Sequence, residues 1–79
     1  MTAYVVVCSD ADKVHYIEPF KKRVDAEAYK AREAMDTYTN ILNEIGVDDE
    51  RTGIEVRRGC ARVFEKENEW RWSVHKIKL

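Results

Sequence analysis

The sequence predicts an α+β domain in the order β-β-α-β-β, with a four-stranded antiparallel sheet of two hairpins packed on one long helix. Three observations support this fold: a valine-rich segment near the N-terminus, a helical repeat in the middle, and two alternating segments at the C-terminal end. A chain of 79 residues leaves room for only one domain. We therefore expect residues 1–79 to form a single compact domain.

The first hairpin is predicted from two short apolar segments separated by a polar turn. Residues 3–8, AYVVVC, are rich in valine and tyrosine, which favours a strand, and residues 13–17, KVHYI, follow the turn SDAD. A two-residue loop pairs Val7 with Val14. This register leaves a second group of side chains on the opposite face: Tyr4, Val6, Cys8, His15 and Ile17.

The helix is predicted over residues 26–45. Asp25 fits the N-cap, and Gly46 fits the position after the helix where glycine adopts a left-handed conformation. Val24 and Tyr29 have the spacing of a hydrophobic staple. Apolar residues recur at spacings of three and four and form one stripe: Ala28, Ala31, Met35, Tyr38, Leu42 and Ile45.

The second hairpin is predicted from residues 54–66 and 69–79, with Glu67 and Asn68 in the turn. A one-residue bulge at Arg58 and Gly59 brings the start of the first segment into phase with its end. We expect the tryptophan side to be the core, because it offers the larger apolar area. That side carries Ala61, Val63, Trp70, Trp72 and Val74, and the other side places Cys60 opposite His75.

A single helix covers only one face of such a sheet, so the other face is expected to be exposed. Its side chains are too apolar for a simple solvated surface and too charged for a core. A contiguous patch of this kind marks an interface. We predict that this face binds a protein partner or a second copy of the chain through Tyr4, Val6, Ile17, Arg62, Phe64, Arg71 and His75.

Charge is distributed unevenly along the chain, although the net charge is only −1. Residues 1–50 contain 6 Lys and Arg against 11 Asp and Glu, whereas residues 51–79 contain 8 against 4. An acidic row on the helix and its following loop is a candidate surface for a basic partner, although an ordinary amphipathic helix gives the same pattern. That row consists of Glu33, Asp36, Glu44, Asp48, Asp49 and Glu50.

The mixture of aromatic and cationic side chains on the exposed face supports nucleic-acid binding as an alternative function. Single-strand binders stack bases on aromatic rings and hold phosphates with cations. Phe64 and Arg71 are expected to be cross-strand neighbours that form a cation–π pair. The sequence contains no ribonucleoprotein motif, and a net charge of −1 argues against strong binding to a polyanion.

Metal binding and catalysis receive little support. Two cysteines and two histidines of the expected outer face, Cys8, His15, Cys60 and His75, are of the types that bind zinc. Their spacing matches no zinc finger, and buried cysteines and interface histidines are the commoner explanation. Cys60 and His75 lack a third orienting group for nucleophilic catalysis. We therefore expect no metal, no cofactor and no enzymatic activity.

No apolar run approaches the roughly 18 residues that a membrane span requires. The N-terminus also lacks the basic and apolar regions of a secretory signal. We therefore expect a cytoplasmic protein without membrane contact, in which Cys8 and Cys60 are free thiols. In size, compactness and lack of motifs, the chain resembles small phage-encoded inhibitors, anti-CRISPR proteins among them. This resemblance implies a non-enzymatic inhibitor that blocks a host nucleic-acid-handling complex by steric or charge-mimicking contact.

Overall fold

The computed structural model describes residues 2–10, 13–45 and 52–78. Their elements are strands β1 (Thr2–Ser9) and β2 (Val14–Phe20), helix α1 (Arg23–Ile45), and strands β3 (Thr52–Arg57), β4 (Cys60–Glu65) and β5 (Asn68–Lys78). All five strands form one antiparallel sheet in the order β2-β1-β5-β4-β3. The predicted α+β class is therefore confirmed, but the sheet has five strands rather than four.

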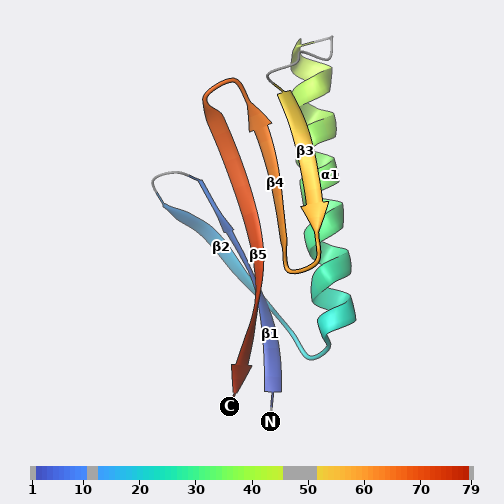
Figure 1. Cartoon of the computed structure of the whole chain (residues 1–79), viewed down its shortest axis with the longest axis vertical. Helices are drawn as coiled ribbons and strands as arrows, with labels where there is room; N and C mark the ends of the chain where they lie inside the picture. The colour runs from blue at the N-terminus through green and yellow to red at the C-terminus, as the bar shows by residue number, and fades with distance from the viewer. Residues whose placement is uncertain (1, 11–12, 46–51, 79) are drawn as a thin grey trace.

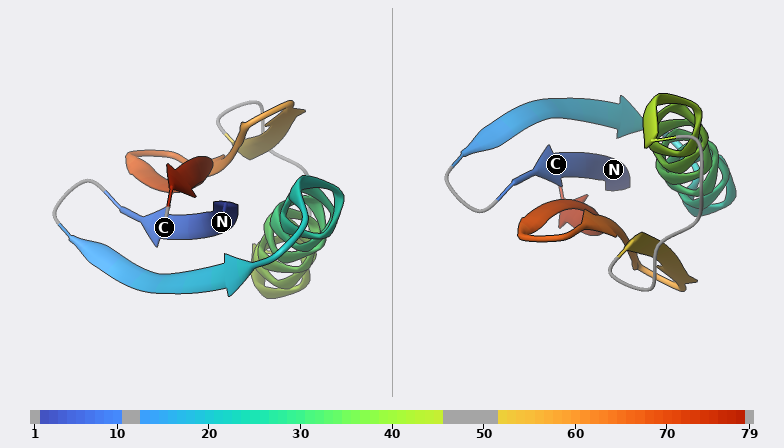
Figure 2. Two further views of the ribbon diagram at one scale, coloured as in Figure 1. Left: turned by 90° about the horizontal axis from the view of Figure 1, so that it is seen from below. Right: turned by 90° about the horizontal axis from the view of Figure 1, so that it is seen from above.

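The sheet curves around the helix, which lies along its concave side (Figures 1 and 2). The helix connects the two edge strands, β2 and β3, and contacts every strand of the sheet. The first and last strands are neighbours at the centre, where Thr2 lies opposite Lys78. Both ends of the chain therefore lie at the same end of the molecule (Figure 1).

The additional strand arises at the position where the sequence predicts a bulge. Residues 58 and 59 form a tight turn instead, so that Arg57 pairs with Cys60 and Ile54 pairs with Val63. Gly59 has a φ of 85°, which glycine adopts without the steric cost that a side chain would add. A bulge and a hairpin turn both favour a glycine in this conformation, so the sequence alone does not separate them.

The second predicted hairpin has the expected faces but a different register. Its turn lies at residues 66–67, and as a result Ser73, not His75, lies opposite Cys60. Each residue thus moves by two positions relative to its expected partner, which leaves every side chain on its expected face. The predicted core side is confirmed: Ala61, Val63 and Trp72 are buried, and Trp70 and Val74 pack against them.

The first hairpin differs from the prediction in a more consequential way. Val7 lies opposite Ile17 rather than Val14, so the register is shifted by an odd number of residues. Such a shift turns the side chains of one strand to the opposite face relative to those of the other strand. The β1 side chains expected on the exposed face lie on the helix side instead: Tyr4, Val6 and Cys8. The assignment of Tyr4 and Val6 to an exposed binding face is therefore wrong, whereas Ile17 is exposed as expected.

The loop of this hairpin is longer than two residues because Asp10 closes it. The Asp10 amide donates a hydrogen bond to the Lys13 carbonyl at 3.0 Å, and its carboxylate accepts one from the Lys13 amide at 3.1 Å. The second carboxylate oxygen lies 2.7 Å from the ring Nε2 of His15. These contacts, with an irregularity in the pairing of β1 and β2 after Cys8, set the register of the hairpin.

Helix α1 is rotated relative to the predicted stripe. It begins at Arg23, so Asp25 lies in the first turn, where a carboxylate favours the helix N-terminus, and is not the N-cap. Ala28, Met35 and the staple residue Val24 are exposed, and the prediction at Gly46 falls outside the described residues. The side chains that are buried follow a different stripe: Ala26, Lys30, Ala34 and Ile41.

The small side chains of this stripe explain the rotation. Alanines allow the helix to lie close to the large aromatic side chains of the sheet, which fill the space between the layers. Tyr4, Tyr16, Phe20, Trp70 and Trp72 supply that aromatic area. Within the described part of the chain, no helix is both long enough and apolar enough to cross a membrane.

Candidate binding face of the sheet

The side of the sheet that faces away from α1, which we call the outer face, is not covered by any other element among the described residues (Figure 2). Strand alternation divides its side chains into two groups. The apolar half lies mainly on β1 and β2 and contains Val5, Val7, Ile17 and Pro19, with Ile77 of β5 beside it. The arginine half lies on β3, β4 and β5 and contains Glu55, Arg57, Cys60, Arg62, Phe64, Glu69, Arg71, Ser73 and His75.

Arg62 is the centre of an ion-pair network in the arginine half. Its Nε and Nη2 atoms each donate to a different oxygen of Glu55 at 3.1 Å, and its Nη1 donates to Glu69 at 3.3 Å. Arg71 donates to the same Glu69 oxygen at 3.2 Å, and Arg57 lies 3.8 Å from Glu55. Three arginines and two glutamates leave a net charge of +1 on the network.

The network stabilises the charged forms of its members. Hydrogen bonds from Arg62 lower the pKa of Glu55, and those from Arg71 and Arg62 together lower the pKa of Glu69 despite some desolvation. The same contacts raise the pKa of Arg62. All three side chains are therefore charged at neutral pH and are held in a fixed arrangement on the open face.

The end of the Phe64 ring lies against the neighbouring strand. A Cβ atom placed on Gly53, its cross-strand partner, would be 2.5 Å from the Phe64 ring, so the ring occupies the space that a side chain would fill. The guanidinium of Arg62 lies 5.0 Å from the ring centroid. The expected cation–π pair of Phe64 with Arg71 is therefore wrong, because Phe64 lies opposite Glu69 and its cationic neighbour is Arg62.

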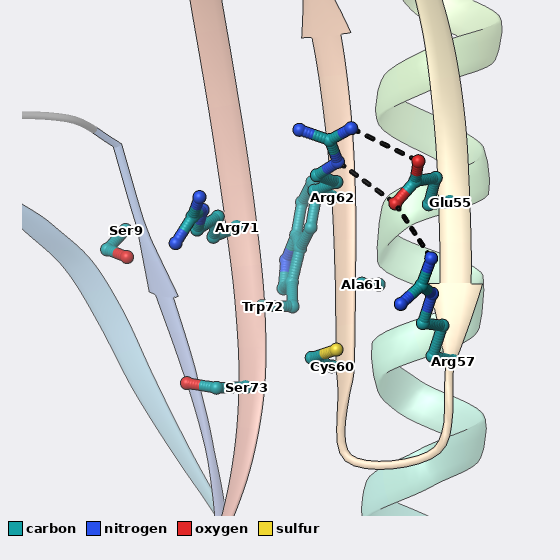
Figure 3. Close-up of a pocket in the computed structure, with 9 residues that line it drawn as sticks. All are labelled: Ser9, Glu55, Arg57, Cys60, Ala61, Arg62, Arg71, Trp72 and Ser73. Atoms are coloured by element: carbon teal, nitrogen blue, oxygen red, sulfur yellow. Dashed lines mark hydrogen bonds and ion pairs between the residues drawn. The ribbon is translucent and has the colours of Figure 1, made fainter.

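A pocket of about 510 Å³ opens in the arginine half (Figure 3). Ser73 and Cys60 are cross-strand neighbours with small side chains. Arg57, Arg62 and Arg71 surround this pair and line the pocket. The Ser73 hydroxyl lies 2.8 Å from the ring Nε2 of His75. The residues that line the pocket are Ser9, Glu55, Arg57, Cys60, Ala61, Arg62, Arg71, Trp72 and Ser73.

A buried ion pair behind the sheet fixes the turn between β3 and β4. Lys30 is 2% exposed, and its ammonium group donates hydrogen bonds to Glu27 and to the carbonyl of Arg57. Both oxygens of Glu27 accept from the Gly59 amide, at 3.0 and 3.1 Å. Desolvation raises the pKa of Glu27, but the hydrogen bonds from Lys30 and Gly59 and the charges of Lys30 and Arg23 outweigh it, so the pKa is lowered.

This ion pair is a feature that the sequence analysis missed. Arg23, Glu27 and Lys30 have the spacing of a helical ion-pair ladder, which was a usable signal. Such a ladder normally lies in solvent, and nothing in the sequence indicates that it reaches the β3–β4 turn. Through the Arg57 carbonyl and the Gly59 amide, the pair holds one side of the pocket in place.

The four side chains of the types that bind zinc, which the sequence supports only weakly as a site, do not converge. Cys8 is buried on the helix side, where desolvation raises the pKa of its thiol, whereas Cys60 is exposed on the outer face. His15 is paired with Asp10 at the end of the first hairpin. Among residues 2–10, 13–45 and 52–78, no group of three or more metal-ligating side chains is present. The proposed pair of Cys60 with His75 is also not formed, since His75 is hydrogen-bonded to Ser73.

The acidic surface is only partly described by the structure. Glu33 lies partly inside the molecule, where its carboxylate accepts a hydrogen bond from the Tyr16 hydroxyl at 3.3 Å. Tyr16 in turn accepts a hydrogen bond from the Trp72 indole at 2.8 Å. Asp36 and Glu44 are exposed on α1. The remaining predicted members lie outside the described residues: Asp48, Asp49 and Glu50.

A scan against models of known protein families matched none, and searches of curated proteins and of solved structures found no similar protein.

Proposed function

We propose that the protein is a non-enzymatic module that binds a protein partner through the outer face. The observation that supports this proposal is the position of exposed apolar side chains beside a fixed network of arginines. Ile17 is 59% exposed next to Val7, and Arg71 is 67% exposed on the adjoining half. Such a surface suits a partner that offers an apolar patch bordered by acidic groups.

The ion-pair network favours binding because its side chains are already ordered. Immobilising a long side chain on association costs about 0.5–1.5 kcal/mol. Arg62 is held by Glu55 and Glu69 before any partner arrives, so a smaller part of that cost remains.

We further propose that this binding is inhibitory and takes place in the cytoplasm. Small phage-encoded inhibitors, anti-CRISPR proteins among them, act by blocking a host nucleic-acid-handling complex, and this chain resembles them in size and lack of motifs. Steric blockade by the outer face is the mechanism we favour over charge mimicry. The reason is that Glu33 bonds to Tyr16 and is withdrawn from the acidic row, whose exposed described members are Asp36 and Glu44.

The test is a pull-down of the tagged protein from lysate of its native host, with and without nuclease, analysed by mass spectrometry. We expect a stoichiometric protein partner that survives nuclease treatment and is lost with Ile17→Glu. Met35→Glu is the matched control, because Met35 is 51% exposed on the helix, away from the outer face. Loss of the partner with Met35→Glu and retention with Ile17→Glu would place the interface elsewhere.

A second copy of the chain is another candidate partner for the apolar half. We propose the homodimer as a second use of the same face. Apolar side chains on two identical faces bury one another in a symmetric contact. Light scattering at increasing protein concentration tests it. A dimer mass that reverts to a monomer mass with Ile17→Glu supports the homodimer, and a monomer mass throughout excludes it.

Nucleic-acid binding is the alternative function, and the exposure of two arginines favours it. Arg57 is 75% exposed and Arg71 is 67% exposed, so both side chains are accessible to phosphates. Phe64 contributes little to base stacking, because its ring lies over Gly53. Affinity measured against salt concentration tests this function: Arg57→Gln should reduce the salt slope by about 1 if Arg57 contacts a phosphate.

A further inference from the structure

The pocket in the arginine half results from a change in side-chain size between neighbouring rows of the sheet. Ser73 and Cys60 lie opposite each other on β5 and β4, and two residues further along these strands Arg71 lies opposite Arg62. The small pair beside the large pair leaves the hollow of about 510 Å³. That volume is within the range of about 300–1,000 Å³ typical of sites for small molecules.

The arginines around the pocket differ in how much hydrogen-bonding capacity remains. Arg62 directs Nε and both terminal nitrogens at Glu55 and Glu69, so it acts as a wall of the pocket. Arg71 uses only its Nε atom, and among the described residues neither of its terminal nitrogens has a hydrogen-bond partner. Arg57, on the opposite rim, approaches Glu55 at 3.8 Å with Nη2, which is beyond hydrogen-bond distance (Figure 3).

The floor of the pocket supplies a further donor. The Ser73 hydroxyl lies 2.8 Å from Nε2 of His75. When that ring nitrogen carries a proton, Ser73 accepts the hydrogen bond from His75, and its own hydroxyl proton is available to a ligand. Donors therefore come from Arg71 and Ser73 on β5 and from Arg57 on β3, on two sides of the pocket. The arginine network also retains a net charge of +1.

From this arrangement we infer that the pocket binds the phosphate group of a small phosphorylated molecule. A phosphate group directs its acceptor oxygens to several sides, which matches donors on two sides of the pocket. A carboxylate presents its two oxygens in one plane and satisfies fewer of them. Arg71 and Arg57 supply guanidinium groups, which hold oxyanions through charge-assisted hydrogen bonds. This site does not rest on the proposed protein partner, and the isolated full chain is sufficient to test it.

The experiment is a titration of the ¹⁵N-labelled protein, followed by amide NMR at constant ionic strength. The probes are inorganic phosphate, O-phosphoserine, acetate and sodium chloride. We expect saturable shifts at the amides of Cys60, Arg71 and Ser73 with both phosphate probes, weaker ones with acetate and none with chloride. Tighter binding of O-phosphoserine than of inorganic phosphate would identify an ester as the ligand, and equal binding would identify free phosphate.

Variants of two arginines make the test specific. Arg71→Gln should weaken phosphate binding about tenfold, because it removes a charge-assisted contact from the rim. Arg58→Gln is the matched control, because Arg58 is exposed at the β3–β4 turn and does not line this pocket. The phosphate affinity of this variant should remain within about twofold of that of the unmodified protein. Both side chains are exposed, and the amide spectra report whether each variant is folded.

The inference is overturned if phosphate causes no saturable shift, or if sodium chloride at the same ionic strength reproduces it. Tighter binding of acetate than of phosphate would also overturn it. So would equal weakening by Arg58→Gln and Arg71→Gln, because that result would mean that phosphate responds to the general charge of the surface and not to this pocket.

Discussion

The two faces of this sheet use polar side chains in opposite ways. On the helix side, polar groups connect the layers: Trp72 donates to Tyr16, which donates to Glu33, and Lys30 holds the β3–β4 turn from the helix. On the outer face, the charged groups bond to one another, both across strands and along β5. The first arrangement stabilises the fold, whereas the second leaves ordered charges and a pocket open to a ligand.

The comparison predicts that neighbouring residues on the same strand contribute very differently to stability. Trp72 is 2% exposed and adjoins the exposed Arg71. We expect Trp72→Ala to lower the free energy of unfolding by about 3–5 kcal/mol, because it removes a buried aromatic side chain from a small core. Arg71→Ala should cost less than about 1 kcal/mol. Urea unfolding followed by far-UV circular dichroism measures both, and equal losses would contradict the division between the faces.

The buried ion pair of α1 should be almost as important as the core aromatic residues. Glu27→Gln leaves the ammonium group of Lys30 in the interior without its counter-charge, which is expected to cost about 3 kcal/mol. The double variant Glu27→Leu with Lys30→Met removes both charges and should recover most of that loss. Urea unfolding of the two variants measures the difference. A double variant as unstable as Glu27→Gln would show that packing and not charge determines the effect.

The same ion pair should make stability depend on pH. The pKa of Glu27 is lower in the folded protein than in the unfolded chain, so its contribution is complete above the unfolded pKa. It is then lost as the pH falls through the folded pKa. We expect the free energy of unfolding to decrease on acidification below about pH 4.5. Glu27→Gln should reduce this slope more than Glu55→Gln, since Glu55 is solvent-exposed. Identical slopes in the unmodified protein and in both variants would contradict the assignment of this pH dependence to Glu27.

A smaller effect is expected on the outer face, at the close approach of Phe64 and Gly53. Gly53→Ala places a methyl group where the Phe64 ring now lies, and the ring must move. We expect a loss of about 1 kcal/mol from this overpacking. In the Phe64→Ala background, the same substitution should be neutral or slightly stabilising, because alanine is favoured over glycine within a strand. A double-mutant cycle by urea unfolding measures the coupling, and strictly additive effects would contradict the contact.

Most of the second predicted hairpin could be derived from its sequence, for a physical reason. Trp70 and Trp72 alternate with Arg71 and Ser73, so the pattern assigns faces without any knowledge of the turn. The actual register differs from the predicted one by an even number of residues, so each side chain stays on its predicted face. The location of Arg62, Phe64, Arg71 and His75 on the outer face was therefore predictable, although their partners were not.

The first hairpin could not be assigned in this way. Val5, Val6 and Val7 are identical residues in succession, so no alternation indicates which of them faces the core. The faces then depend on the loop length, which the hydrogen bonds of Asp10 with Lys13 determine. The buried ammonium group of Lys30 was equally unpredictable, because lysine on a helix is normally exposed.

The most direct test of the proposed interface uses the two cysteines, which lie on opposite faces of the sheet. Cys60 is exposed on the outer face and Cys8 is buried on the helix side. Alkylation rates of both thiols are measured by mass spectrometry, for the free protein and for the protein saturated with the partner recovered by pull-down. We expect rapid labelling of Cys60 in the free protein and strong protection in the complex, with Cys8 unreactive in both. Unchanged labelling of Cys60 in the saturated complex would contradict binding through the outer face.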